Sequence, residues 1–226
     1  MSERDAIFAR IREGLRVQAP VPGHHGHGTS EGHEALQSFR QWLPQVGASF
    51  DEQIAAFQKA SGELKTDFHL LDDQASAHAR LNEIAVAESW KKIAGHRHPE
   101  VEAAIGVLKL PSMHTDEGYD VHELEQCDAG ISACDALVAQ TGSVLVTSRS
   151  AGGRALSVLP PHHVVLARRE QLVPDLTAAL QRAKEAYAPD FPSFIGFITG
   201  PSRTGDIERI LVLGAHGPKK LTVLCW

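Results

Sequence analysis

The stretch "DFHLLDDQASAHARLNEIAVAESWKKIAG", residues 67–95, decides the fold. Its first five residues form a short apolar run typical of a strand. Residues 73–90 place Ala, Leu and Ile on one helical face behind a capping aspartate, which predicts a helix. "KKIAG" (91–95) then predicts the next strand. A strand, a helix and a strand in succession favour a parallel sheet covered by helices.

The same alternation continues to the end of the sequence. Further helices are predicted at 99–108 and 174–187, and further strands at 163–167, 194–199 and 221–225. The segment "DALVAQTGSVLVTS" (135–148) predicts two adjacent strands joined by a tight turn. Residues 66–226 are therefore expected to form an α/β domain with a mainly parallel sheet flanked by helices. Ligands of such folds gather where strands end and helices begin.

Residues 1–65 are expected to form a mostly helical N-terminal extension. Helical patterns occur at about 2–17 and over 34–61, where Pro44 and Gly47 divide them. Between them lies a segment rich in Pro, Gly and His, which predicts a flexible loop at 19–33. Its histidines have no cysteine or carboxylate in register, so solvated side chains are favoured over a metal site.

Composition narrows the class of protein. The chain has 226 residues and a formal net charge of −6, with its 22 Lys and Arg residues spread out, which argues against a nucleic-acid partner. No apolar run approaches the roughly 20 residues of a membrane helix. The charged N-terminus lacks the apolar core of a secretory signal. We therefore expect a cytoplasmic protein without a membrane partner.

The cysteines argue against a cofactor in this chain. Cys127, Cys134 and Cys225 lack the Cys-x-x-Cys spacing of zinc and iron–sulfur sites, and three cysteines make no disulfide framework. The acidic run at 116–128 carries oxygen ligands at irregular spacing, which favours a solvated loop over a metal site. We expect neither a metal nor a cluster here.

The first of three polar stretches at predicted strand ends is "AQTGSVLVTSRSAGGRALS" (139–157). Thr141, Gly142, Ser143 and Arg154 offer hydroxyls, bare amides and a fixed positive charge, which suit a carboxylate or phosphate. The same composition is also typical of a hairpin followed by a surface loop. Spacing alone does not separate the two interpretations.

The second stretch, "TGPSRTGDIERILVLGAHGP" (199–218), overlaps the third, "GAHGPKK" (214–220). Gly200 and Pro201 end a strand, and Ser202 or Thr204 could cap a following helix whose amides, with Arg203, would face an anion. A capped helix with a local Asp206–Arg203 ion pair is the simpler alternative, and 206–213 would suit a strand equally well. His216 lies between glycines, where it could serve as a base or only form a turn.

Three long segments carry a resemblance to a known family. "DAGISACDALVAQTGSVLVTS", "LPPHHVVLARREQLVPDL" and "TGPSRTGDIERILVLGAHGPKKLTVLCW" resemble the lactate-utilisation (LUD) domain, specifically the protein C group, over residues 66–226. The resemblance implies a fold similar to the ribose-phosphate isomerase, glucosamine-phosphate deaminase and CoA-transferase superfamily. It also implies a role in bacterial oxidation of L-lactate to pyruvate beside two partner proteins that carry iron–sulfur clusters. Gln140 stands where the family often has an acid, which counts against covalent acyl chemistry there.

The leading hypothesis is therefore a component of an L-lactate oxidation system that binds a small organic acid. We expect His216 and Asp206 to shape or polarise the pocket, with His216 the candidate for proton transfer. The remaining candidates for binding are Thr141, Gly142, Ser143, Arg154, Thr199, Gly200, Ser202, Arg203, Thr204 and Gly217. A stand-alone enzyme on a phosphorylated or CoA-linked small molecule and a non-catalytic scaffold or ligand sensor are the alternatives.

Overall fold

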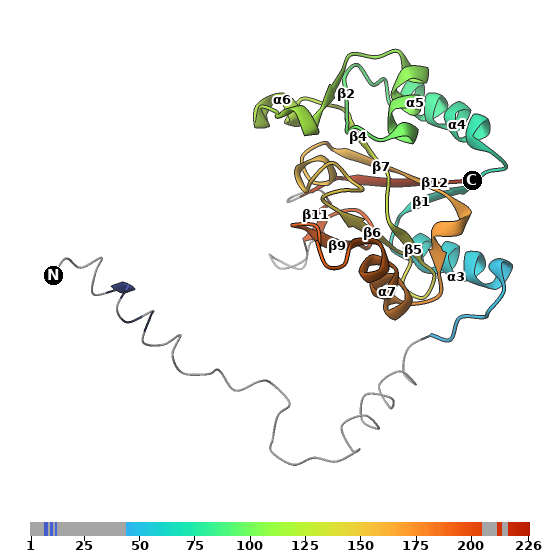
Figure 1. Ribbon diagram of the computed structural model, residues 1–226. Helices are drawn as coiled ribbons and strands as arrows, with labels where there is room; N and C mark the ends of the chain where they lie inside the picture. The colour runs from blue at the N-terminus through green and yellow to red at the C-terminus, as the bar shows by residue number, and fades with distance from the viewer. Residues whose placement is uncertain (1–6, 9, 11, 13–43, 205–211, 214–216) are drawn as a thin grey trace. The chain divides into compact units, whose positions relative to one another are not determined.

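The computed structural model describes residues 7, 8, 10, 12, 44–204, 212, 213 and 217–226 (Figure 1). The chain divides into two units, residues 1–44 and 45–226. Residues 7, 8, 10 and 12 are helical, and the rest of the predicted extension up to residue 43, the loop at 19–33 included, lies outside the described residues. All of the described strands belong to the second unit.

A six-stranded sheet lies at the centre of this unit (Figure 1). All of its neighbouring strands are parallel. In order across the sheet they are β1 (Asp67–Leu70), β12 (Lys220–Cys225), β7 (His162–Ala167), β4 (Ala129–Ser132), β2 (Ile93–Gly95) and β3 (Ser112–His114). The predicted α/β fold with a mainly parallel sheet is confirmed.

One face of this sheet is covered by α4 (Gln74–Ala87) and α5 (Pro99–Leu108). Asp73 caps α4 by accepting a 2.7 Å hydrogen bond from the amide of Ser76, and Pro99 occupies the first turn of α5. Leu81 of α4 is fully buried against the apolar side chains of the sheet. The region 116–128, expected as a loop, contains the short helix α6 (Val121–Glu125), and a 3₁₀ turn (Thr115–Glu117) precedes it.

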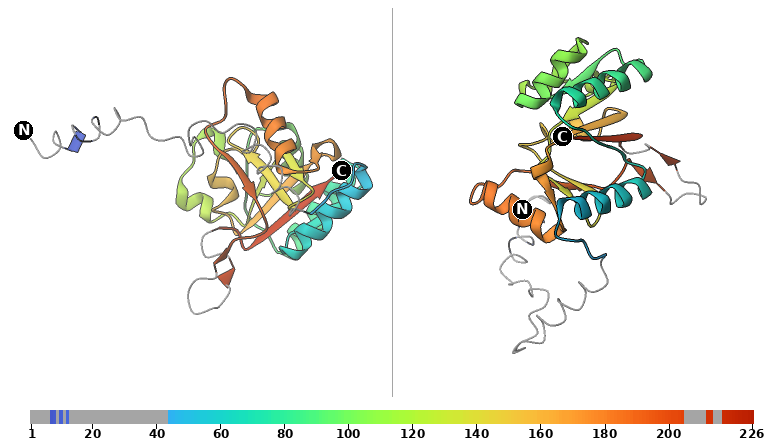
Figure 2. Two further views of the ribbon diagram at one scale, coloured as in Figure 1. Left: turned by 90° about the horizontal axis from the view of Figure 1, so that it is seen from below. Right: turned by 90° about the vertical axis from the view of Figure 1, so that its right-hand side faces the viewer.

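A second sheet of four strands packs against the other face. Its order is β8 (Leu172–Val173), β5 (Ala136–Val138), β6 (Ser143–Thr147) and β9 (Ile195–Ile198). β5 and β6 pair antiparallel, as the sequence predicts for 135–148. Helix α7 (Leu176–Tyr187) covers the outer face of this sheet, so the unit has four layers of helix, sheet, sheet and helix (Figure 2). Further 3₁₀ turns lie at Ala155–Ser157 and Arg169–Gln171.

Helix α3 (Phe50–Glu63) packs in the same unit as the sheets. Ser49 and Glu52 form a reciprocal capping box at its start. Phe57 is fully buried and meets Phe68 of β1 edge to face at a centroid distance of 5.0 Å. The domain boundary predicted from the sequence is at 65/66, and the compact unit that contains the sheets begins at Gln45.

The segment after β9 differs from the capped helix that the sequence allowed. Arg203 and Thr204 form strand β10, which pairs antiparallel with β11 (Val212–Leu213). Because Arg203 and Thr204 are extended and pair in a ladder, a helix capped by Ser202 is wrong. A helix capped by Thr204 would begin at residue 205, and residues 205–211 lie outside the described residues. Among the described helices, none is both long and apolar enough to cross a bilayer.

Candidate functional site

The predicted turn at Thr141, Gly142 and Ser143 lies against the C-terminal end of α3. Gly142 has φ of +63°, and a Cβ there would overlap the backbone of Ser61. The Ser143 hydroxyl lies 2.8 Å from the hydroxyl of Thr199, so the first two polar stretches do meet. Because the backbone of this turn packs directly against a helix, the glycine is explained by packing without a bound ligand.

The second and third polar stretches also meet. The amide of Ser202 donates a 2.9 Å hydrogen bond to the carbonyl of Pro218, and a Cβ at Gly217 would contact the side chain of Ser202. Gly200 has φ of +83° and packs on the carbonyl of Leu64. These contacts place 199–204 and 217–218 together, beside the start of β12. Arg203 is exposed, and Asp206 and His216 lie outside the described residues.

Arg154 lies apart from this group. It is exposed and precedes the 3₁₀ turn Ala155–Ser157, in a loop whose Gly152 carbonyl accepts a 2.7 Å hydrogen bond from Thr115. Thr115 follows β3, so this loop lies at the carboxyl ends of the parallel strands. Ser202 and Gly217 lie by the amino end of β12, that is, at the opposite ends of the parallel strands. The structure therefore does not gather Arg154 with the other predicted binding residues.

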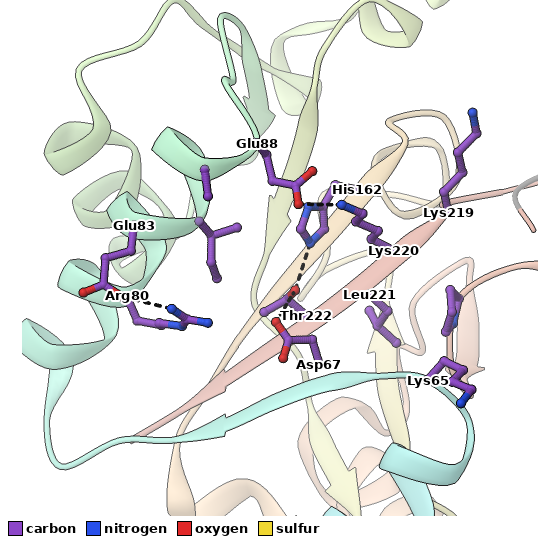
Figure 3. A pocket seen from close by; sticks show the side chains of 13 residues that line it. Lys65, Asp67, Arg80, Glu83, Glu88, His162, Lys219, Lys220, Leu221 and Thr222 are labelled. Carbon is purple, nitrogen blue, oxygen red and sulfur yellow. Dashed lines mark hydrogen bonds and ion pairs between the residues drawn. The ribbon is translucent and has the colours of Figure 1, made fainter.

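A cavity of about 360 Å³ opens beside Pro201, at the amino ends of β1, β12 and β7 and beneath α4 (Figure 3). This differs from the carboxyl ends, which are the usual place for a ligand site in parallel sheets. The cavity is lined by Lys65, Asp67, Arg80, Glu83, Ile84, Ala87, Glu88, His162, Pro201, Lys219, Lys220, Leu221 and Thr222.

Three of these side chains form a hydrogen-bonded row on the α4 face of the sheet. His162 Nε2 lies 2.8 Å from Thr222 Oγ1, and Thr222 Oγ1 lies 3.5 Å from Asp67 Oδ2 (Figure 3). Strand register explains the row: Asp67 pairs with Thr222, and alternate residues of a strand share a face. The row joins three parallel strands across the floor of the cavity.

Cationic side chains exceed carboxylates around the cavity. Arg80 pairs with Glu83 at 2.9 Å, and Lys220 pairs with Glu88. Within the described residues, Lys65 and Lys219 have no ion-pair partner. Two unpaired ammonium groups beside a polar floor suit a small anion.

Lys65 adopts an unusual backbone conformation. It follows the end of α3 with φ of +69°, a region that costs a residue with a side chain about 1–2 kcal/mol. The amide of Thr66 donates to the carbonyl of Ser61 across it, which closes the helix end. A glycine would satisfy this turn better, so the turn itself does not require a lysine.

His162 is a neutral imidazole at pH 7. It is 5% exposed, and burial lowers its pKa to about 4, against a smaller opposing effect of Glu88. Its ring meets Trp90 edge to face at 5.2 Å. A neutral, held imidazole can accept or donate one hydrogen bond to a ligand without a charge change.

His163, the next residue, points to the other face of the sheet. Its Nε2 lies 2.9 Å from Ser132 Oγ, and its side chain is fully buried. Among the described residues no group of three potential metal ligands occurs, and all three cysteines are free and buried. Desolvation raises the pKa of Cys225 to about 12, which makes it a poor thiolate ligand.

None of the side chains that line this cavity was predicted from the sequence as a site residue; they include Asp67, His162, Thr222 and the lysines at 65, 219 and 220. One signal was present: "KLTVLC" puts Lys220 and Thr222 on one face of a strand, and a histidine doublet opens "HHVVLA". Polar residues at alternate positions of a buried strand indicate a polar floor. Their neighbours across the sheet are distant in the chain, since residues 67 and 222 are 155 positions apart, and the sequence does not pair them.

Comparison with known proteins identifies the class. The family model described as "LUD domain" matches residues 23–225. The chain belongs to the LUD domain family. The crystal structure of a DUF162 family protein from Deinococcus radiodurans has the same fold, with a TM-score of 0.62 and 19% identity over 79% of this chain and 99% of that one.

Curated relatives narrow the comparison further. The chain is 38% identical over 198 residues to lactate utilization protein C of Geobacillus sp. (strain WCH70), covering 81% of this chain and 82% of the relative. It is 30% identical over 193 residues to the protein of that name from Geobacillus kaustophilus, covering 80% of each. A third, from Oceanobacillus iheyensis, is 29% identical over 192 residues, covering 79% and 81%.

Proposed function

We propose that this chain is a component of a bacterial L-lactate oxidation system and that the cavity under α4 binds a small organic acid such as lactate. The observation that carries the proposal is the pair of unpaired ammonium groups, Lys65 and Lys219, beside the polar row of His162, Thr222 and Asp67. The choice of lactate as the acid comes from the relatives that are named lactate utilization protein C.

Each part of the acid has a matching group. The carboxylate would lie against Lys220, with Lys219 and Lys65 at the mouth of the cavity, where an ammonium–carboxylate hydrogen bond contributes roughly 1.5–3 kcal/mol. The 2-hydroxyl would reach the polar row, and Ile84 and Ala87 of α4 would contact the methyl group. Because His162 is neutral, it adds no positive charge to those of the lysines around the cavity.

The predicted residues next to the cavity belong to the same proposal. Pro201 lines the cavity and precedes Ser202, Arg203 and Thr204, which we propose close over the bound acid. Asp206 and His216 remain the candidates for polarising it and for proton transfer. Six further predicted residues would pack against this loop and hold its backbone in place: Thr141, Gly142, Ser143, Thr199, Gly200 and Gly217. Arg154 remains a candidate binding residue, although it does not line the cavity.

The redox centres would belong to partner proteins. Oxidation of lactate to pyruvate removes two electrons, so an acceptor is needed. The three cysteines of this chain are too few for a four-cysteine iron–sulfur cluster, and each is buried as a free thiol. We therefore propose association with iron–sulfur subunits, with the acid held by this chain.

Calorimetric titration of the full chain with L-lactate tests the proposal. We expect saturable binding that Lys219→Ala weakens at least about fivefold, about 1 kcal/mol, because one charged hydrogen bond is lost. Lys59→Ala removes an exposed lysine of α3 as the matched control and should leave binding unchanged. Absence of lactate binding, or tighter binding of a sugar phosphate, contradicts the proposal.

A further inference from the structure

The hydrogen-bonded row favours a proton on Nε2 of His162. The carboxylate of Asp67 only accepts, and its Oδ2 lies 3.5 Å from Thr222 Oγ1 and 3.0 Å from His69 Nε2. A Thr222 hydroxyl that donates to Asp67 offers only lone pairs to His162 Nε2, 2.8 Å away, so Nε2 then carries the hydrogen. The imidazole is neutral, and in this tautomer its Nδ1 is a bare lone pair.

This Nδ1 is an acceptor without a donor. It is buried and has no hydrogen-bond partner among the described residues. A buried acceptor left unsatisfied is unfavourable, so a ligand that donates a hydrogen bond to it should bind at least about fivefold more tightly. A hydroxyl can donate, whereas a keto oxygen cannot.

The Glu88–Lys220 ion pair lies beside this nitrogen. A second cavity, of about 240 Å³, adjoins the first, and the two share Glu88, His162, Lys219 and Lys220 as lining residues. Figure 3 shows the His162 ring with one side toward Thr222 and the other toward the ion pair. The Glu88 and Lys220 side chains are 36% and 54% exposed. An ion pair this exposed contributes little to stability, so a ligand can open it.

We propose that His162 Nδ1 accepts a hydrogen bond from the hydroxyl of a 2-hydroxy acid whose carboxylate replaces Glu88 at Lys220. The inference rests on the proposed function and narrows it. His162 becomes the residue that distinguishes the 2-hydroxy acid from the 2-keto acid of equal charge and length. A bound acid is then held in its reduced form and released once oxidised.

Parallel calorimetric titrations of the full chain with L-lactate and pyruvate test this selectivity. We expect L-lactate to bind at least about tenfold more tightly, because sites built around a ligand hydroxyl reject analogues that lack it. His162→Gln keeps a donor for Thr222 and removes the Nδ1 acceptor, so the two acids should then bind with similar affinity. Equal binding to the unmodified chain overturns the inference and leaves the proposed function standing. Binding of neither acid overturns the proposed function itself.

Nitrogen-15 NMR of the unmodified chain tests the tautomer without a variant that must fold. We expect the His162 signals of a neutral ring protonated at Nε2, with Nδ1 shifted by L-lactate and not by pyruvate. A ring protonated at Nδ1 overturns the inference.

Glu88→Gln tests the exchange of carboxylates at Lys220. Because the acid no longer competes with Glu88, we expect L-lactate to bind about two- to fivefold more tightly, in line with a gain of up to about 1 kcal/mol. Glu123→Gln is the matched control: it releases Lys92 from a similar ion pair of 2.7 Å on another part of the surface and should not change binding. Unchanged or weaker binding to Glu88→Gln overturns the proposed exchange.

Discussion

Lys65 shows at the residue scale how a binding role can be separated from a structural one. Its left-handed conformation is one that glycine adopts more easily, yet the position carries an ammonium group at the mouth of the cavity. Lys109 has φ of +53° at the end of α5 and does not line the cavity. The two lysines share a backbone conformation and differ in surroundings.

Lys65→Gly should weaken L-lactate binding at least about fivefold, since one charged hydrogen bond is lost. The same change should leave stability equal or raise it by up to about 1 kcal/mol, because relief of the left-handed strain offsets the flexibility of glycine in the unfolded chain. Calorimetry and urea unfolding measure the two effects. Lys109→Gly should match the stability change and leave binding intact. Loss of binding in both variants would contradict the assignment of Lys65.

Buried histidines make stability depend on pH. Burial lowers the pKa of His96 and of His162 from 6.5 to about 4, and that of His163 to about 3. Between pH 6.5 and 4 the unfolded chain binds more protons than the folded chain, so stability is highest above pH 6.5 and decreases as pH falls through this range. Each shift to about 4 corresponds to about 3 kcal/mol once complete.

Urea unfolding at pH 7 and pH 4.5 should therefore show a clear loss of stability at the lower pH. His162→Gln removes one titrating group, so its loss between the two pH values should be smaller by about 1–3 kcal/mol. An unchanged pH dependence in this variant would mean that His162 is not buried as a neutral ring. Far-UV circular dichroism at pH 7 serves as the control for folding.

At the scale of elements, the turn between β5 and β6 and the end of α3 form one packed unit. Gly142 approaches the backbone of Ser61 with a positive φ, whereas Gly62, in the last turn of α3, has open space where a Cβ would be. Substitution of alanine should therefore change the stability of the chain in opposite directions at these two glycines, although both lie where the turn meets α3.

Gly142→Ala should destabilise the chain by about 2–4 kcal/mol, because the new Cβ meets helix backbone and φ is unfavourable. Gly62→Ala should stabilise it by up to about 1 kcal/mol, because alanine loses less freedom in a helix. Urea midpoints of the two variants measure the contrast. Similar midpoints would show that α3 does not rest on this turn.

At the scale of the whole molecule, the described hydrophobic cores lie within residues 45–226. Val46 and Phe57 pack against the core between the two sheets, so a shortened chain must keep the segment from Gln45 onward. A chain of residues 45–226 should bind L-lactate as tightly as the full chain, because this unit contains every lining residue of the cavity. Calorimetric titration of both chains measures this. Weaker binding to the shortened chain would contradict the assignment of the site to this unit alone.

The sequence by itself determined most of the helices and strands, the α/β class of the fold and the family. Asp73 and Pro99 mark helix starts, and the 135–148 hairpin follows from two apolar runs around a glycine turn. The three segments that resemble the LUD domain also identified the family, because residue identity over a long chain suffices for that. Helix caps and hairpin turns are local in the sequence, and family membership follows from residue identities along the chain. Neither kind of prediction therefore requires knowing which strands pair in the sheet.

Only the tertiary structure decided the second sheet, the strand at Arg203–Thr204 and the cavity. Apolar alternation identifies a strand without naming its partner, and an extended segment is fixed by the ladder it joins. Asp67, His162 and Thr222 become a row because β1, β7 and β12 align in one register, although residues 67 and 222 lie 155 positions apart. The same parallel arrangement separates Arg154 from Ser202, since the loop of Arg154 lies at the carboxyl ends of the strands and the loop of Ser202 lies at their amino ends.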